Sequence, residues 1–194
     1  MEHWNQQIFL LVNQHAGSNV YFDWMMIAFA EYLPIVFAVV LIWLGFFNKK
    51  RSAFDRDERR QAAFFAGYTM VVGLLINYLI TLIYFHPRPF MDHLGTALIV
   101  HVPDSSMPSD HTTLMVSVAF GLLLFGLTRK IGVVLLILGV LGGAARVYCG
   151  VHYPFDILAS VAVSLFAATL GYCFKKYLMN LSGSLFGVLD RILK

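Results

Sequence analysis

Residues 61 to 85, QAAFFAGYTMVVGLLINYLITLIYF, contain no charged side chain. A membrane-spanning helix needs about 20 consecutive residues that are mainly apolar, so this segment is long enough to cross a bilayer. Four other segments are similarly apolar and lie at residues 23–47, 112–128, 131–145 and 157–174. Because the bilayer core holds no water to bond exposed backbone groups, such segments form helices. The sequence therefore predicts an all-α, polytopic transmembrane helical bundle.

The composition supports a membrane protein and excludes a secreted soluble enzyme. Hydrophobic residues make up 59% of the chain and charged residues only 13%, whereas a soluble domain carries roughly 25% charged residues. Two amphipathic stretches, Trp4–His15 and Leu181–Leu193, precede and follow the apolar segments and are expected to be interfacial helices. Since the first could also enter the membrane, we predict five to six spans.

The basic residues are distributed asymmetrically between the predicted connections. Twelve of the fourteen fall in connections or ends on one side, which the positive-inside rule assigns to the cytoplasm. These twelve are Lys49, Lys50, Arg51, Arg56, Arg59, Arg60, Arg129, Lys130, Lys175, Lys176, Arg191 and Lys194. The other two, Arg88 and Arg146, fall on the opposite side with all seven histidines. Ionisable residues far apart in the sequence are thus expected at one depth on the outer face.

The first stretch predicted on that face is FHPRPF, Phe85–Phe90, with Arg88 between two prolines. An arginine guanidinium presents a planar fork of donors that matches phosphate oxygens two at a time. The alternative is an arginine that merely extends to lipid headgroups. Because only Arg88 and Arg146 break the basic asymmetry, we favour a phosphate-binding role for both.

The second stretch is MPSDH, Met107–His111, just before an apolar segment. Ser109 or Asp110 suits the N-cap position of a helix, and capping alone would explain both residues. A helix N-terminus also offers unpaired N–H groups to an anion, to which the Ser109 hydroxyl can add a donor. His111 would then lie in the first turn, where a histidine beside a phosphate is suited to general acid–base catalysis.

The third stretch is CGVHYPFD, in which His152 and Asp156 are four residues apart. Pro154 suits the first turn of the next helix, and Gly150 allows a tight connecting turn. Asp156 would then accept a hydrogen bond from one imidazole nitrogen of His152 and leave the other nitrogen with its lone pair. This is the arrangement of an oriented nucleophile, although a purely structural His–Asp pair at a helix start would look the same.

Taken together, the motifs Arg-Pro, Pro-Ser-x-His and Arg-x5-His-x3-Asp resemble those of the type 2 phosphatidic acid phosphatase superfamily of membrane lipid phosphatases. The resemblance covers about residues 61–173, and FHPRPF and PSDHTT look most like the bacitracin-resistance type of undecaprenyl pyrophosphate phosphatase. It implies a phosphohistidine on His152, oriented by Asp156, with His111 as acid and then base. It also implies that Arg88, Arg146 and Ser109 hold the phosphoryl oxygens. No cofactor and no metal site are expected.

The chain departs from the family pattern at three positions. Thr81 stands where the family usually has a lysine, Ala145 stands in place of a serine, and Asp110 stands in place of a glycine. Asp110 therefore bears on the choice of substrate, and Tyr84 is a further candidate for substrate contact. Glu31, an acid within an apolar segment, is a functional candidate by its position alone.

We therefore expect one membrane-embedded lipid phosphatase domain over residues 1–194. It would convert undecaprenyl pyrophosphate to undecaprenyl phosphate and phosphate at the outer face of a bacterial plasma membrane, recycling a carrier lipid for cell-wall synthesis. The expected partners are the polyprenyl pyrophosphate and the bilayer, and not nucleic acid. Alternatives are phosphatidic acid or phosphatidylglycerol phosphate as substrate, and phosphate transfer to another lipid. From other classes, a transporter and a non-catalytic lipid-binding protein also remain open.

Overall fold

The computed structural model describes residues 2–47 and 52–192, so that Lys49, Lys50, Arg51 and Lys194 lie outside the described residues. The described residues form seven α-helices and one short 3-10 helix, with no strand among them. The all-α prediction is confirmed. The helices are α1 (Glu2–Asn13), α2 (Val20–Phe46), α3 (Ala53–Ile83), α4 (Asp110–Leu123), η1 (Gly126–Thr128), α5 (Arg129–Tyr148), α6 (Pro154–Cys173) and α7 (Lys175–Ile192).

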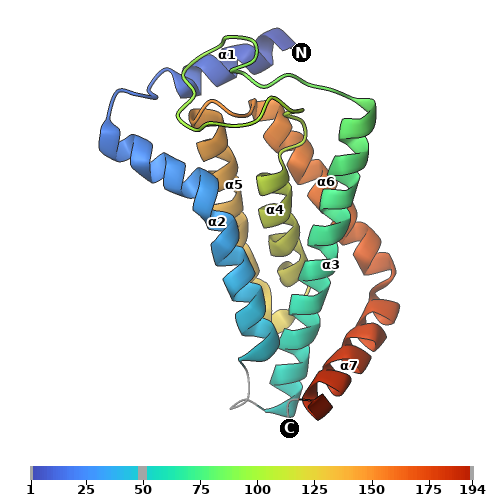
Figure 1. Ribbon diagram of the computed structural model, residues 1–194. Coiled ribbons are helices and arrows are strands. Elements are labelled where there is room, and N and C mark those ends of the chain that lie inside the picture. The colour runs from blue at the N-terminus through green and yellow to red at the C-terminus, as the bar shows by residue number, and fades with distance from the viewer. Residues whose placement is uncertain (1, 48–51, 193–194) are drawn as a thin grey trace.

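The short helix α4 is the centre of the bundle, with α2, α3, α5 and α6 packed around it (Figure 1). Close packing against α3 depends on Gly121, where an added Cβ would lie only 2.6 Å from the Cα of Ala66. Small residues of this kind allow helices in a membrane to approach closely, which compensates for the absence of a hydrophobic driving force between them. The buried residues Phe65, Met115 and Leu122 fill the core around this contact.

Among the described residues, four helical segments are long and apolar enough to cross a membrane: α2, α3, η1 together with α5, and α6. The expected third span, residues 112–128, is shorter than predicted, because α4 ends at Leu123 and a turn leads into η1. Its 14 residues extend for only about 21 Å. The surrounding helices shield this segment, and the Thr128 hydroxyl and the Glu58 carboxylate bond the backbone around the turn. A break in a helix is tolerated at membrane depth where protein surrounds it.

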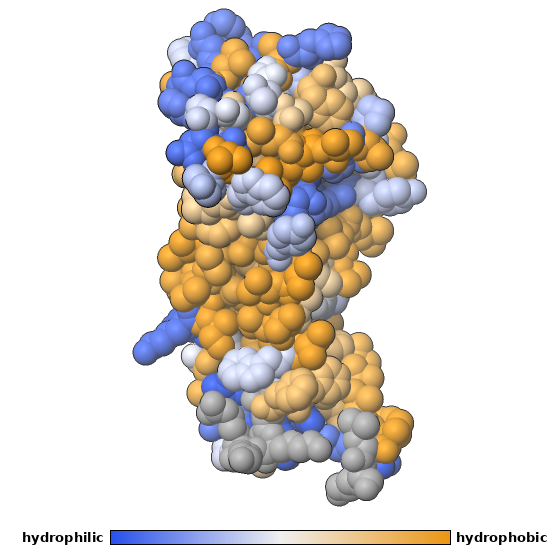
Figure 2. Space-filling view, turned by 60° about the vertical axis from the view of Figure 1, so that its left-hand side comes forward, coloured by the Kyte–Doolittle hydropathy of each residue, from blue (hydrophilic) through white to orange (hydrophobic). Residues whose placement is uncertain are grey.

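The two ends of the bundle are hydrophilic and are separated by a broad hydrophobic band (Figure 2). The basic residues Arg56, Arg60, Arg129 and Lys175 belong to the lower end in Figure 1, where α3 and α5 begin and α6 is followed by α7. The connections α3–α4 and α5–α6 lie at the upper end. The molecule therefore has the polarity profile of a membrane-embedded bundle.

Both terminal helices pack against the bundle. Helix α1 lies across the upper end, where Phe9 contacts Tyr153 edge to face at 5.3 Å. Helix α7 begins directly after α6 and continues to the lower end beside the first part of α3, to which it is joined by two 2.8 Å hydrogen bonds from Arg60 to Asp190. The predicted amphipathic stretches are thus present as helices, although α7 begins at Lys175 and not near Leu181.

Candidate active site

A cavity of about 560 Å³ opens at the upper end of the bundle, below the α3–α4 and α5–α6 connections. Its polar wall includes five of the predicted site residues: Arg88, Asp110, His111, Arg146 and His152. Its apolar wall includes Pro34 of α2, Leu74 of α3 and Leu114 of α4. The three sequence motifs, which are up to 64 residues apart, therefore meet around one cavity.

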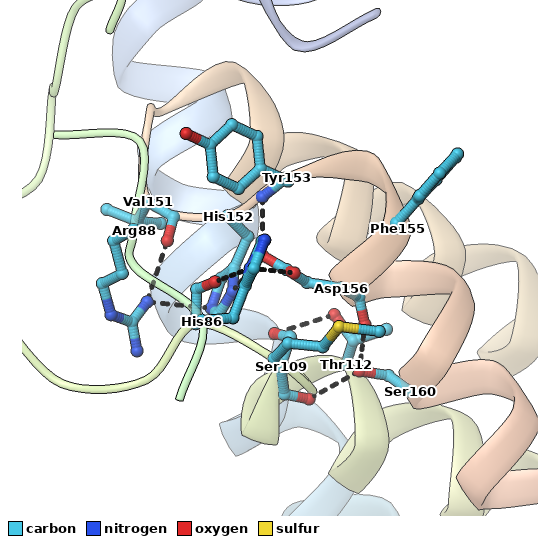
Figure 3. Close-up of polar contacts among 12 residues, drawn as sticks. His86, Arg88, Ser109, Thr112, Val151, His152, Tyr153, Phe155, Asp156 and Ser160 are labelled. Atoms are coloured by element: carbon cyan, nitrogen blue, oxygen red, sulfur yellow. Dashed lines mark hydrogen bonds and ion pairs between the residues drawn. The ribbon is translucent and has the colours of Figure 1, made fainter. Parts of the chain in front are cut away.

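His152 lies in the tight connection between α5 and α6, and Asp156 lies one turn into α6 (Figure 3). Gly150 makes this connection possible, because it adopts a φ of +79° that disfavours other residues. The Nδ1 atom of His152 is 3.4 Å from Asp156 Oδ2, and the Tyr153 N–H donates to the same oxygen at 2.7 Å. Asp156 therefore caps α6 and faces the imidazole at the same time. The sequence left open whether the His–Asp pair is structural or orients a nucleophile, and this geometry is compatible with both roles.

Arg88 fixes the tautomer of His152. Its Nη1 atom lies 3.2 Å from His152 Nε2 and 2.8 Å from the carbonyl oxygen of Val151. Because a guanidinium can only donate, Nε2 must be the accepting nitrogen, and the proton of the neutral ring lies on Nδ1, facing Asp156. The Nε2 lone pair therefore points to Arg88, and both residues line the cavity.

The environment of His152 also favours its neutral form. Burial lowers the pKa of His152 to about 4, and the positive charges of Arg146 and Arg88 act in the same direction. The contact with Asp156 opposes these effects by favouring the charged imidazolium. At neutral pH, His152 is therefore an unprotonated imidazole beside a buried carboxylate.

Arg146 approaches the cavity from the last turn of α5 and is almost completely buried. Its Nη1 atom donates to the Ala30 carbonyl oxygen and to Glu31 Oε1, both at 3.1 Å. Glu31, which had no clear role in the sequence, is thus the carboxylate that pairs with this buried guanidinium. A buried charge needs such a partner, because leaving it alone is costly.

Ser109 and His111 lie at the start of α4, as predicted. Ser109 is the N-cap residue, but its side chain makes no capping bond and accepts instead from the Thr112 hydroxyl at 3.2 Å. Its backbone carbonyl accepts from Ser160 of α6 at 3.0 Å, which ties the start of α4 to the helix that carries Asp156. His111 reaches the cavity wall, whereas the Ser109 side chain is buried behind it.

The departures from the family pattern have separate surroundings. Asp110 and Thr81 both line the cavity. Asp110 accepts a hydrogen bond from Asn77 at 3.0 Å, and the Thr81 hydroxyl bonds to the backbone of its own helix. Ala145 packs in an apolar cluster.

Tyr84 lies just beyond the end of α3 at Ile83. The Tyr84 ring is about half exposed and stacks on His86. Its predicted contact with substrate stays a prediction.

Three residues make contacts near the site that were not predicted from the sequence. His86 lies 3.2 Å from Asp156 Oδ1, and Asp104 accepts from Arg88 Nε at 2.7 Å. Asn13 of α1 donates to the backbone of Thr96 and Tyr148, which joins the two upper connections. Only His86 had a local signal, since it is part of the same FHPRPF stretch as Arg88.

No group of three or more His, Cys, Asp or Glu side chains is placed to hold a metal ion anywhere in residues 2–47 and 52–192. The acidic residues nearest the two guanidiniums, Asp104 and Glu31, are each paired with an arginine. The polar wall of the cavity presents two guanidiniums and three imidazoles together with the carboxylates of Asp104 and Asp110. The two guanidiniums are the groups on this wall that suit an anion.

Comparisons with known proteins agree with a phosphate-handling membrane fold. The profile of the PAP2 superfamily matches residues 62–180. The chain belongs to the PAP2 superfamily, as its motifs predicted. It is 38% identical over 176 residues to the undecaprenyl-diphosphatase BcrC of Bacillus subtilis (strain 168), covering 90% of this chain and 86% of that protein.

Two further relatives extend the comparison. The bacitracin transport permease protein BcrC of Bacillus licheniformis is 30% identical over 142 residues, covering 72% of this chain and 64% of that protein. The crystal structure of Aquifex aeolicus LpxE matches with a TM-score of 0.66 at 21% identity, covering 86% of this chain and 93% of that chain. This structural match supports the fold.

Proposed function

We propose that this protein is a membrane lipid phosphatase that hydrolyses undecaprenyl pyrophosphate to undecaprenyl phosphate and inorganic phosphate. The observation that carries the proposal is the neutral His152 imidazole, which presents Nε2 to a cavity lined by Arg88 and Arg146 and has Asp156 behind it. A nucleophile, its orienting carboxylate and two cationic donors are what transfer of a phosphoryl group requires. The name of the Bacillus subtilis relative supports the choice of substrate.

In the first step, the Nε2 lone pair of His152 attacks the terminal phosphorus. The bond from this phosphorus to the bridging oxygen breaks, and His111, which takes up a proton from solution as the anionic substrate binds beside it, donates that proton to the leaving lipid monophosphate. Asp156 stabilises the positive charge that develops on the imidazole. Arg88 and Arg146 neutralise the equatorial oxygens, with a further donor expected from Ser109. Since phosphoryl transfer depends mainly on positioning and charge stabilisation, these groups are sufficient for the step.

In the second step, water attacks the phosphohistidine. His111, now unprotonated, accepts a proton from the water as its oxygen bonds to phosphorus. The phosphorus–nitrogen bond breaks, phosphate is released, and His152 regains its neutral form. The cycle returns every group to its starting state and consumes one water for each pyrophosphate. No resident metal takes part in this scheme.

The apolar part of the cavity wall suits the lipid portion of the substrate. Pro34, Leu74 and Leu114 come from α2, α3 and α4 and line the same cavity as the charged residues. A headgroup bound at His152 would therefore have its hydrocarbon tail along these residues and in contact with the bilayer. This arrangement favours a lipid over a soluble phosphate ester.

The asymmetry of the basic residues supports an active site on the extracytoplasmic side of a bacterial plasma membrane. We also propose that the whole chain forms one domain. The site lies at the end of the bundle opposite Arg56, Arg60 and Lys175. In that orientation the enzyme would recycle a carrier lipid that is released outside the cytoplasm. A transport function, as in the name of the Bacillus licheniformis relative, predicts ionisable residues along a pathway through the bundle. Here they cluster at helix ends on one side.

The decisive experiment measures phosphate release from undecaprenyl pyrophosphate by purified protein in detergent. Wild type should release phosphate, and His152→Ala should lose several orders of magnitude in rate. Wild type incubated with substrate labelled at the terminal phosphate and quenched in alkaline denaturant should carry acid-labile, base-stable label that His152→Ala lacks. Release from phosphatidic acid or phosphatidylglycerol phosphate, with none from undecaprenyl pyrophosphate, would contradict the proposed substrate and retain the enzyme class. No release from any of these lipids would contradict the enzyme class.

A further inference from the structure

Asp156 is fully buried and contacts two histidines (Figure 3). Oδ2 faces His152 Nδ1 at 3.4 Å, and Oδ1 faces His86 Nδ1 at 3.2 Å. His86 comes from the connection after α3, whereas Asp156 belongs to α6, so the second contact joins segments that are 70 residues apart in the sequence. The described reaction uses the first of these contacts and leaves the second without a role.

We propose that His86 is a positioning residue, which holds Asp156 in the orientation that directs the Nε2 atom of His152 into the cavity. This inference rests on the proposed function of His152 as the nucleophile. His86 lies behind Asp156 and is absent from the cavity wall, so it acts through the carboxylate and not on the substrate. His86 orients Asp156, and Asp156 in turn orients the nucleophile His152.

The surroundings of His86 specify which ring nitrogen carries the proton. Nδ1 lies 2.8 Å from the Ser106 hydroxyl oxygen, whose own proton is donated to the Pro87 carbonyl oxygen at 3.2 Å. The Ser106 oxygen is therefore an acceptor for His86, and the nearby carboxylate oxygen of Asp156 is an acceptor as well. A proton on Nδ1 suits both neighbours, because it can bond the Ser106 hydroxyl oxygen and places positive charge 3.2 Å from Asp156 Oδ1.

The His86 ring is also held in place by its neighbours. Tyr84 stacks on one face with an interplanar angle of 14°, and Tyr153 contacts it edge to face at 5.3 Å. The backbone N–H of His86 donates to the Ser105 hydroxyl at 3.2 Å, and its carbonyl oxygen accepts from the Ser106 N–H at 2.8 Å. A rigidly held donor of this kind can restrict the rotation of a carboxylate, which a solvated group would not do.

The charge on Asp156 explains why a second donor is needed. A carboxylate without exposure to water is stabilised in its ionised form by donors or positive charge close to its oxygens. Oδ2 has the Tyr153 N–H and the His152 ring, whereas Oδ1 faces His86. Without His86, the carboxylate can rotate towards another donor and lose its alignment with His152.

The test compares His86→Asn with His86→Gln. The amide nitrogen of asparagine can occupy the position of the histidine Nδ1 atom, whereas that of glutamine reaches the position of Nε2. His86→Asn should retain a kcat within about threefold of wild type, and His86→Gln should lose roughly 10- to 100-fold in kcat with little change in KM. His93→Gln, at an exposed histidine in the same connection, is the matched control and should behave as wild type.

A second readout needs no substrate. Nitrogen-15 NMR of histidine-labelled protein in detergent, with His152 assigned by its loss in His152→Gln, reports the tautomer of this ring. Wild type and His86→Asn should show His152 protonated at Nδ1 alone, whereas His86→Gln should show a mixture of tautomers. Equal kcat values in the two His86 variants, or an unchanged His152 spectrum in His86→Gln, would overturn the proposal. If wild type released no phosphate from any lipid, the proposed function would fail while the spectrum still decided the role of His86.

Discussion

Replacing Asp156 with asparagine should reduce kcat by about three to four orders of magnitude. The substitution preserves size and shape but removes the charge that faces His152 Nδ1 at 3.4 Å. With an effective dielectric constant of about 20, a unit charge at this distance stabilises a developing imidazolium by roughly 5 kcal/mol. Each 1.36 kcal/mol corresponds to a tenfold change in rate, which gives the expected loss.

The asparagine also has one acceptor where the aspartate has two. One carboxylate oxygen accepts from the Tyr153 N–H at 2.7 Å, and the other faces His86 at 3.2 Å. The amide must therefore direct its NH2 group towards a donor on one side. This conflict should lower the free energy of unfolding by about 1–3 kcal/mol, which thermal unfolding in detergent would measure.

The assay is steady-state hydrolysis together with detection of the phosphohistidine after quenching in alkaline denaturant. Asp156→Asn should reduce kcat and the rate of phosphohistidine formation together, while KM changes little. Asp190→Asn is the matched control, because it makes the same chemical change in a carboxylate that binds Arg60 at the opposite end of the bundle. A folded Asp156→Asn enzyme that kept more than about a tenth of the wild-type kcat would refute the electrostatic argument.

Three further predictions concern pH, packing and metal ions. Burial lowers the pKa of His152 to about 4, so protonation of this ring should not reduce kcat/KM as the pH falls to about 5. A decline in kcat/KM centred on the ordinary histidine pKa of about 6.5 and assigned to His152 would contradict this. The same shift means that the unfolded state binds the proton first, so stability should decrease as pH falls from about 6.5 towards 4. Gly121→Val should lower the free energy of unfolding by about 1–3 kcal/mol, because α3 and α4 are in contact at this residue. Gly67→Ala is the control and should leave the stability unchanged, since no atom lies within 4 Å of the added Cβ. Thermal unfolding would measure both. Phosphate release should persist in EDTA, and loss of activity that only added Mg²⁺ restores would argue against the proposed mechanism.

The helices and their starting residues were predictable because their signals are local. Apolar runs of sufficient length define membrane helices whatever their neighbours are, and Pro154 and Ser109 lie at the helix starts where their types are favoured. The spacing of His152 and Asp156 also needed only local geometry. The length of α4 was not predictable in the same way, because the apolar run continues past Leu123 and only the surrounding helices tolerate the break.

The contacts that complete the site depend on segments far apart in the chain. Glu31 pairs with Arg146 across 115 residues, and Arg88 reaches His152 across 64 residues. No sequence signal links the two members of either pair, because the distance between them depends on how separate helices and connections pack. For Glu31 and Arg146, these elements are α2 and α5. The role of His86 was missed for the same reason, since the motif places it near Arg88 but says nothing about its distance from Asp156.

The sequence by itself determined a helical membrane protein with phosphate-binding and nucleophilic residues collected at one end, because hydrophobicity, charge asymmetry and helix starts act over one or two turns. Only the tertiary structure decided which carboxylate pairs with which cation, and which nitrogen of His152 faces the cavity. These features depend on distances of about 3 Å between different helices and connections. A buried charge is stabilised only when a partner lies within such a distance. The packing of the helices and connections therefore specifies the chemistry of the site.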